Sequence, residues 1–190
     1  MSTLAIEIND AELVIADQSG VIATEPGYAT FVDGSIITGL DAYAQLRLKP
    51  RQTSNRFWDE LSMDSGSAGI DAVDSSAELA FAQLNSIWKR FGKTGMDALL
   101  VVPGHYTREQ LGLLLGLSQE CKMPVRAMVN AGVAASTQPY PGCRLVYLDA
   151  SLHRVSAVMI DQSDDVSERY EQGLNSVGLA SLLDLLATRV

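Results

Sequence analysis

Few side chains in this sequence could do acid–base or nucleophilic chemistry, and they are scattered. The two histidines, His105 and His153, have no serine or cysteine nucleophile suggested beside them, so we interpret them as a strand-end residue and an exposed turn residue. The two cysteines, Cys121 and Cys143, lie in unrelated segments without the spacing of metal ligands. Two reduced thiols are the simpler expectation, and one disulfide is the alternative. The sequence therefore predicts no catalytic residue and no metal site.

The charge balance narrows the choice of partners. The chain of 190 residues has a formal net charge of -9 and is 47% hydrophobic, enough for a buried core. An acidic surface repels phosphate backbones and anionic membranes, so neither nucleic acid nor a membrane is expected as a partner. Residues 1–10 have no basic region and are interrupted by polar residues, and no apolar run is long enough to span a bilayer. We expect a soluble, cytoplasmic protein.

Short apolar runs separated by turn residues predict a meander at the start of the chain. Residues 4–8 and 12–16 are strand-like and are joined by the turn residues Asn9 and Asp10. A second turn, at residues 19–20, leads to a third run at residues 21–23. These segments predict three consecutive antiparallel strands.

A smaller subdomain is expected next. Residues 29–32 are strand-like and are followed by the turn pair Asp33–Gly34. A short helix is expected over residues 41–48, and it must end before Pro50, because the residue before a proline avoids the helical region. Residues 62–75 are small, polar and acidic, which predicts an exposed linker.

The clearest helix is expected over residues 76–91. Ser75 and Glu78 have the spacing of a capping box, and Gly92 predicts a left-handed stop. A stripe of five side chains recurs at helical intervals and is expected to be buried: Ala77, Phe81, Leu84, Trp88 and Phe91.

The middle of the chain alternates strands and helices. The continuous apolar run at residues 97–102 predicts a strand buried on both faces. Thr107 and Gln110 repeat the capping-box spacing before a leucine-rich helix at residues 111–120. A strand at residues 124–129 and a short helix at residues 130–136 follow.

The pattern restarts after a proline-rich break. Strands are expected at residues 144–148, 155–161 and 167–171, and a helix at residues 176–188. Four leucines form one stripe of that helix: Leu179, Leu182, Leu183 and Leu186. The order of elements predicts an α/β fold with a mixed sheet flanked by helices.

Four collinear stretches carry a resemblance to a known family. They read PGYATF with IITGLDA, LKPRQT, ALLVVPGHY with Gln110, and RAMVN with Ala134 and Ala135. In this order and spacing, over roughly residues 3–180, they resemble the actin-like ATPases, and among these the 70-kDa heat-shock chaperones. The resemblance implies an actin-like ATPase (ribonuclease H-like) fold: a first lobe at residues 1–138, with a small inserted subdomain at about 26–75, and an incomplete second lobe at residues 143–190.

The same resemblance implies where phosphate would lie. In this family two hairpins with close-approach glycines hold the phosphates of ATP, and carboxylates organise the magnesium ion. The positions that match them here, and that would be cofactor-binding if the site were intact, are Glu7, Asn9, Asp10 and Asp149. Asn9 replaces a glycine, and Asp10 brings a negative charge that would repel a phosphate about 4 Å away by roughly 1–4 kcal/mol. We interpret the site as vestigial, and solvated hairpin residues are the plain alternative for the carboxylates.

Two further family positions depart from the pattern. The lysine that faces the transferred phosphate falls near Trp58, where only Arg56 in a reshaped loop could substitute for it. The glutamate that orders magnesium-bound water becomes Ala131. The resemblance therefore implies a lost or radically changed ATPase function.

Three functional hypotheses follow. The first is a non-catalytic, chaperone-related module that acts through contact with an unknown protein partner and needs no cofactor. The second is the N-terminal part of a working, Mg-ATP-dependent chaperone that continues past Val190. A weaker third is a relative of the sugar or metabolite kinases. The leucine stripe either pairs two chains as a homodimer or folds back on the first lobe.

Overall fold

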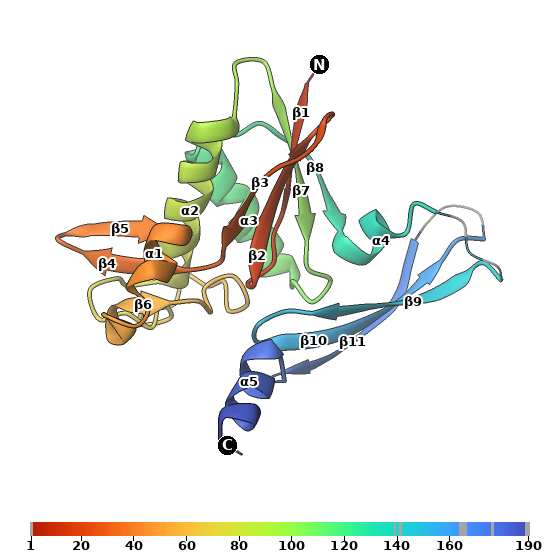
Figure 1. Ribbon diagram of the computed structural model, residues 1–190. Helices are drawn as coiled ribbons and strands as arrows, with labels where there is room; N and C mark the ends of the chain where they lie inside the picture. Colours follow the sequence, from red (N-terminus) through yellow and green to blue (C-terminus); the bar gives the residue numbers. More distant parts are fainter. Residues whose placement is uncertain (1, 139, 141, 164–166, 176, 189–190) are drawn as a thin grey trace. The chain divides into compact units, whose positions relative to one another are not determined.

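The computed structural model describes residues 2–138, 140, 142–163, 167–175 and 177–188 (Figure 1). The fold is α/β, with a mixed sheet flanked by helices, as the order of elements predicted. Contacts between residues divide the chain into two compact units. The first consists of Met1–Leu100 and Thr107–Ala127, and the second of Val101–Tyr106 and Met128–Val190.

The first unit opens with the predicted meander. Strands β1 (Thr3–Glu7), β2 (Glu12–Asp17) and β3 (Gly20–Pro26) pair antiparallel in chain order. Side chains alternate along β1 and β2, so that one face of each strand is buried, and this burial sets the register. The core on this face is formed by Leu4, Ile6, Leu13 and Ile15.

A helical crossover extends this sheet. Strand β7 (Asp97–Val102) is followed by helix α3 (Arg108–Glu120) and strand β8 (Val125–Asn130), and the sheet order is β3-β2-β1-β7-β8. A helix between neighbouring strands is the connection of a parallel pair, so the sheet is mixed. The predicted capping box is confirmed, because Thr107 and Gln110 each bond the backbone of the other. The expectation that β7 is buried on both faces was wrong, since every second residue is only half-buried.

The first unit also contains a second, three-stranded sheet, in the order β5-β4-β6. Strands β4 (Ala29–Val32) and β5 (Ser35–Thr38) are joined by Asp33 and Gly34, with φ of 50° and 80°. Positive φ at both positions is the geometry of a two-residue hairpin turn and explains the Asp–Gly pair. The helix α1 (Leu40–Gln45), the short 3-10 helix η1 (Pro50–Gln52) and strand β6 (Thr53–Ser54) complete this part of the first unit.

Helix α2 spans Ser76–Phe91, which confirms its predicted bounds, and of the predicted stripe Ala77 and Leu84 are buried. The buried face is centred on Ala80, Gln83 and Ile87, whereas Phe81 and Trp88 are only half-buried. Gln83 is drawn inward by a buried hydrogen bond from the indole of Trp58, at 2.8 Å. The aromatic residues of the predicted stripe thus lie at the border of the buried face.

The ends of α2 also differ from expectation. Ser75 makes no side-chain capping hydrogen bond, so the predicted capping box is absent. Gly92 has a φ of -68°, so it is not a left-handed stop. A Cβ at this position would lie 2.6 Å from both the ring atom Cδ2 and the carbonyl oxygen of Trp88, and glycine is needed because the chain passes so close to them.

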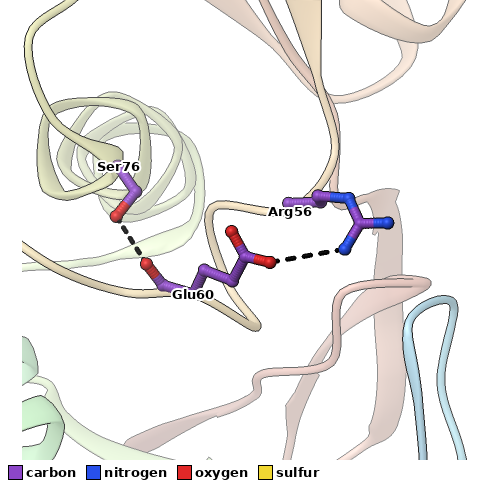
Figure 2. Close-up of polar contacts among 3 residues, drawn as sticks. All are labelled: Arg56, Glu60 and Ser76. Atoms are coloured by element: carbon purple, nitrogen blue, oxygen red, sulfur yellow. Dashed lines mark hydrogen bonds and ion pairs between the residues drawn. The ribbon is translucent and has the colours of Figure 1, made fainter. Parts of the chain in front are cut away.

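Residues 62–75 are not the exposed linker that their composition predicted. Ala68, Ile70 and Val73 are buried in this segment. The fully buried Ser76 ties it to α2: its hydroxyl donates to the Glu60 carbonyl at 2.8 Å (Figure 2) and accepts from the Ser62 backbone N–H at 2.8 Å. Serine hydroxyls satisfy buried backbone groups here, so a small and polar composition does not imply exposure.

The second unit contains the short helix α4 (Ala131–Ala135) and an antiparallel sheet in the order β11-β10-β9. The bounds of its strands are Arg144–Ala150 for β9, Arg154–Asp161 for β10 and Ser167–Asn175 for β11. All three predicted strands are confirmed, and β11 is longer than expected. Val158 and Ile160 on β10 form the core of this unit, and Gly132 of α4 lies against Tyr147 and Ile160.

The last described element is helix α5 (Leu179–Ala187). It begins on the β9–β10 hairpin, where the backbone N–H groups of Leu179 and Ala180 donate to the carbonyls of Ser151 and Leu152, both at 2.9 Å. Ser176, the predicted first residue of this helix, lies outside the described residues. In the described part of the chain, no helix has both the length and the hydropathy to cross a bilayer.

Candidate functional site

Two of the four residues that the sequence singled out, Asn9 and Asp10, lie in the turn between β1 and β2, and a third, Glu7, is the last residue of β1. The side chain of Asn9 closes this turn, since its Oδ1 accepts a hydrogen bond from the backbone N–H of Ala11 at 2.9 Å. Asp10 is 4% exposed, and Glu7 and Asn9 are half-buried. The solvated turn that was the plain alternative is therefore wrong for Asp10.

The chain itself packs against this turn. Gly27 is buried beside Asp10, and a Cβ at Gly27 would lie only 2.3 Å from the Asp10 carbonyl oxygen. This is much closer than two non-bonded heavy atoms approach, so only glycine can be accommodated there. A phosphate-binding hairpin presents free backbone N–H groups to its ligand. Here the Ala11 N–H, one backbone donor of the turn, already has Asn9 Oδ1 as its partner.

Asp149, the fourth candidate, belongs to the second unit. It lies on β9, is half-buried and is opposite Ser156 of β10. The following turn contains His153, which we expected to be exposed and which is buried. The turn is closed by the Ser151 N–H bond to the Arg154 carbonyl at 2.9 Å, and Gly178 packs against its backbone. The structure thus places Glu7 at the end of β1, Asn9 and Asp10 in the turn that follows it, and Asp149 on a strand of the second unit.

The residue that the resemblance matches to the family lysine, Trp58, is a buried indole. The resemblance places Trp58 at the mouth of the phosphate site and so predicts partial exposure, but Trp58 is 1% exposed. Its Nε1–H donates to Gln83 Oε1 at 2.8 Å, and Gln83 Nε2–H donates to the Pro26 carbonyl at 2.9 Å. The indole N–H can be buried because it has this partner.

Arg56, the only nearby cation considered as a substitute for that lysine, has another partner. Its Nη1 lies 3.3 Å from Glu60 Oε1, and both side chains are about half exposed (Figure 2). Such an exposed pair contributes little to stability, about 0–1 kcal/mol. It also places the guanidinium beside a carboxylate that would compete with an anionic ligand.

The position of the family glutamate is an alanine at the start of a short helix. Ala131 is buried, and Asn130 caps α4 through Oδ1, which accepts from the N–H groups of Gly132 at 2.8 Å and Val133 at 3.3 Å. The Oδ1 atom of Asn130 is therefore bonded to the backbone of its own helix.

A groove of about 530 Å³ in the first unit was missed by the sequence reasoning. Its lining includes the buried carboxylate of Glu25, which is ion-paired with Arg90 of α2, and Gly39 lies against Glu25. The two partners are 65 residues apart, so no local pattern could reveal the pair. Since the carboxylate has a cationic partner, we interpret the pair as a structural tie between β3 and α2.

The two cysteines have different surroundings, and neither forms a disulfide. Cys121 is buried at the end of α3, and this burial raises the pKa of its thiol to about 11. Cys143 is exposed. Only a thiolate is a good nucleophile, so Cys121 is chemically inert near neutral pH.

We therefore expect a single reactive thiol in the folded chain. At pH 8 a pKa of about 11 leaves roughly one Cys121 thiolate in a thousand, and burial excludes the reagent as well. Iodoacetamide should modify Cys143 rapidly and Cys121 only after unfolding, as read by peptide mass spectrometry. The Cys143→Ser variant should have no fast phase. Equal rates at both cysteines in the folded chain would contradict this prediction.

Among the described residues, no three His, Cys, Asp or Glu side chains are gathered as a metal ion would require. A scan against protein-family models and a search of curated proteins both found no match to this sequence. The class that the fold defines is an α/β protein with a mixed sheet flanked by helices.

Proposed function

We propose that this chain is a chaperone-related, actin-like module of the cytoplasm that is non-catalytic and acts through protein–protein contact. The observation that carries the proposal is the hydrogen bond between Asn9 Oδ1 and the Ala11 N–H. It occupies a backbone donor at the turn that matches the first phosphate hairpin of the family. The resemblance of the four sequence stretches supports the ancestry, and this bond argues against the ancestral activity.

Two further features support the loss of activity. Asp10 adds a negative charge at the same turn, which at effective dielectrics between those of water and a protein surface opposes a phosphate about 4 Å away by roughly 1–4 kcal/mol. The indole of Trp58 cannot replace a lysine, because it has no charge and its N–H is bonded to Gln83. Transition states of phosphoryl transfer need such positive charge.

The proposal is tested by calorimetric titration with Mg-ATP. We expect no binding at ligand concentrations up to the millimolar range and no release of phosphate. The Asn9→Gly variant frees the Ala11 N–H and serves as a control for the hydrogen bond. A micromolar dissociation constant that is lost in Asp149→Ala would contradict the proposal and favour its alternative, the N-terminal part of a working ATP-dependent chaperone.

The protein contact that we propose for the second unit is a homodimer through α5. Its leucines are 40–66% exposed in the structure, among them Leu179, Leu182, Leu183 and Leu186. A wholly apolar helix face of this kind is an association surface that proteins rarely leave bare. A two-fold axis would pair the stripe with itself.

Sedimentation equilibrium tests this contact. The wild-type chain should be a dimer, and Leu182→Glu with Leu186→Glu should make it a monomer. The matched control is Leu115→Glu, which adds a carboxylate at an exposed leucine of α3. A wild-type monomer at all concentrations would show that the leucine stripe is not a dimer interface.

A further inference from the structure

A second apolar surface lies in the first unit, beside helix α2. We name it the α2–α3 groove; its volume is about 610 Å³. Six apolar residues line it: Ile36, Met63, Ala77, Phe81, Ala82 and Leu117. Helix α2 packs against both α3 and β5, so the groove is built on regular elements.

The arrangement of these residues suits a helical ligand. Ala77 and Phe81 are one turn apart on α2, and Leu117 faces the groove from α3. Met63, in the segment that precedes α2, also lines the groove and is 65% exposed. A shallow apolar trough between two helices is a surface on which a third, amphipathic helix can lie. Methionine is flexible and polarisable, so it can adapt to such a ligand. This surface also accounts for Phe81 being only half-buried.

The charged residues that line the α2–α3 groove indicate what charge a bound helix should have. Glu78 and Glu120 are both exposed members of it, and all its residues are described, with no lysine or arginine among them. The chain as a whole has a net charge of -9. Helix α5 of a second copy is a poor occupant, because Asp184 is the one charged residue within Leu179–Ala187 and has the same sign as the groove. Charge complementarity therefore favours a basic partner.

We propose that the α2–α3 groove binds a basic amphipathic helix of a partner protein. Its apolar side chains, spaced at i, i+3, i+4 and i+7, pack on Phe81 and Leu117. Its lysines or arginines flank these anchors and pair with Glu78 and Glu120. The inference rests on the proposed function, since it names the chemistry of one protein contact of this module.

The probe is a labelled 18-residue peptide of leucine and lysine with the leucines on one helical face. The control peptide has the same sequence with glutamate in place of lysine. In a fluorescence anisotropy titration with the full chain, the lysine peptide should bind saturably and the glutamate peptide at least about tenfold more weakly. No saturable binding of the lysine peptide would overturn the proposal.

Charge-reversal variants test the location of the site. Glu78→Lys with Glu120→Lys should reverse the preference, so that the glutamate peptide binds better. Glu12→Lys with Glu109→Lys gives the same net charge at exposed carboxylates outside the groove and should leave the preference unchanged. If the control pair weakens binding as much as the groove pair, the peptide responds to net charge and the proposal is wrong.

Apolar variants separate the groove from α5. Leu117→Asp and Met63→Asp should each weaken the lysine peptide about tenfold or more, whereas Leu115→Asp, an exposed leucine on the same helix, should not. Unchanged circular dichroism and melting temperature of Met63→Asp exclude unfolding as the cause. If Leu182→Glu with Leu186→Glu abolishes peptide binding instead, the site is α5 and the proposal fails. Binding of Mg-ATP would defeat the proposed function and leave these peptide results unaffected.

Discussion

Replacing Trp58 with alanine should lower the free energy of unfolding by about 3–5 kcal/mol, the range for truncating a large buried aromatic residue. The indole packs beside the buried ring of Phe57, with ring centroids 5.5 Å apart. Its removal also leaves Gln83 Oε1 without the indole donor that it has at 2.8 Å. Trp58→Phe keeps most of the volume and should still cost about 1–3 kcal/mol, because a buried acceptor loses its donor.

Trp88 provides the matched control. It is half-buried on α2, so Trp88→Ala should cost clearly less than Trp58→Ala in the same denaturant titration. Acrylamide should quench Trp88 more than Trp58 in the two single-tryptophan variants. Equal losses of stability, or stronger quenching of Trp58, would show that the buried position of Trp58 is wrong.

Gly27→Ala should destabilise the chain by about 3 kcal/mol or more, at or above the upper end of the usual cost of overpacking. The added Cβ would lie 2.3 Å from the Asp10 carbonyl oxygen and 2.9 Å from its carbonyl carbon. Both are backbone atoms, so no side-chain rotation can relieve the overlap. The turn at Asp10 or the segment at Gly27 would have to move.

Gly116→Ala is the control, and it should raise the stability of the chain where Gly27→Ala lowers it. Gly116 lies on the exposed side of α3, and a Cβ there meets nothing within 4 Å. Alanine is the better helix former, so this variant should be more stable than wild type by about 0.5–1 kcal/mol. The melting temperatures of both variants, compared with that of the wild type, test these two predictions. A Gly27→Ala chain as stable as wild type would mean that the turn is not packed against residue 27.

Local patterns in the sequence predicted much of the fold. The turn residues between short apolar runs predicted the β1–β2–β3 meander. They also predicted β4 and the turn at Asp33–Gly34, but not the strand β5 that completes the hairpin. The periodicity and the stop at Gly92 predicted the bounds of α2, although Gly92 acts by its closeness to Trp88. Such features are encoded within a few neighbouring residues, which is why sequence reasoning finds them.

Burial was harder to predict than secondary structure. The resemblance predicted that Trp58 is partly exposed, and the helical periodicity of α2 predicted that Trp88 is buried; the structure has them the other way round, with Trp58 buried and Trp88 half-buried. The hydrogen bond between Trp58 and Gln83, which are 25 residues apart, accompanies the burial of the indole and of Gln83. Likewise, the serine-rich segment at residues 62–75 is packed through hydrogen bonds to Ser76 that its composition does not reveal.

At the candidate site, too, the local turn could be predicted from the sequence and its burial could not. The sequence by itself predicted a hairpin turn at Asn9 and Asp10, directly after Glu7, and the resemblance implied that Asn9 stands where the family has a close-approach glycine. Only the tertiary structure decided that Asp10 is buried, that Asn9 occupies the Ala11 N–H, and that Gly27 covers the Asp10 carbonyl. The segment at Gly27 is itself held by the bond from Gln83 to the Pro26 carbonyl. A turn is a local property of four residues, whereas its accessibility depends on whichever distant segment packs against it.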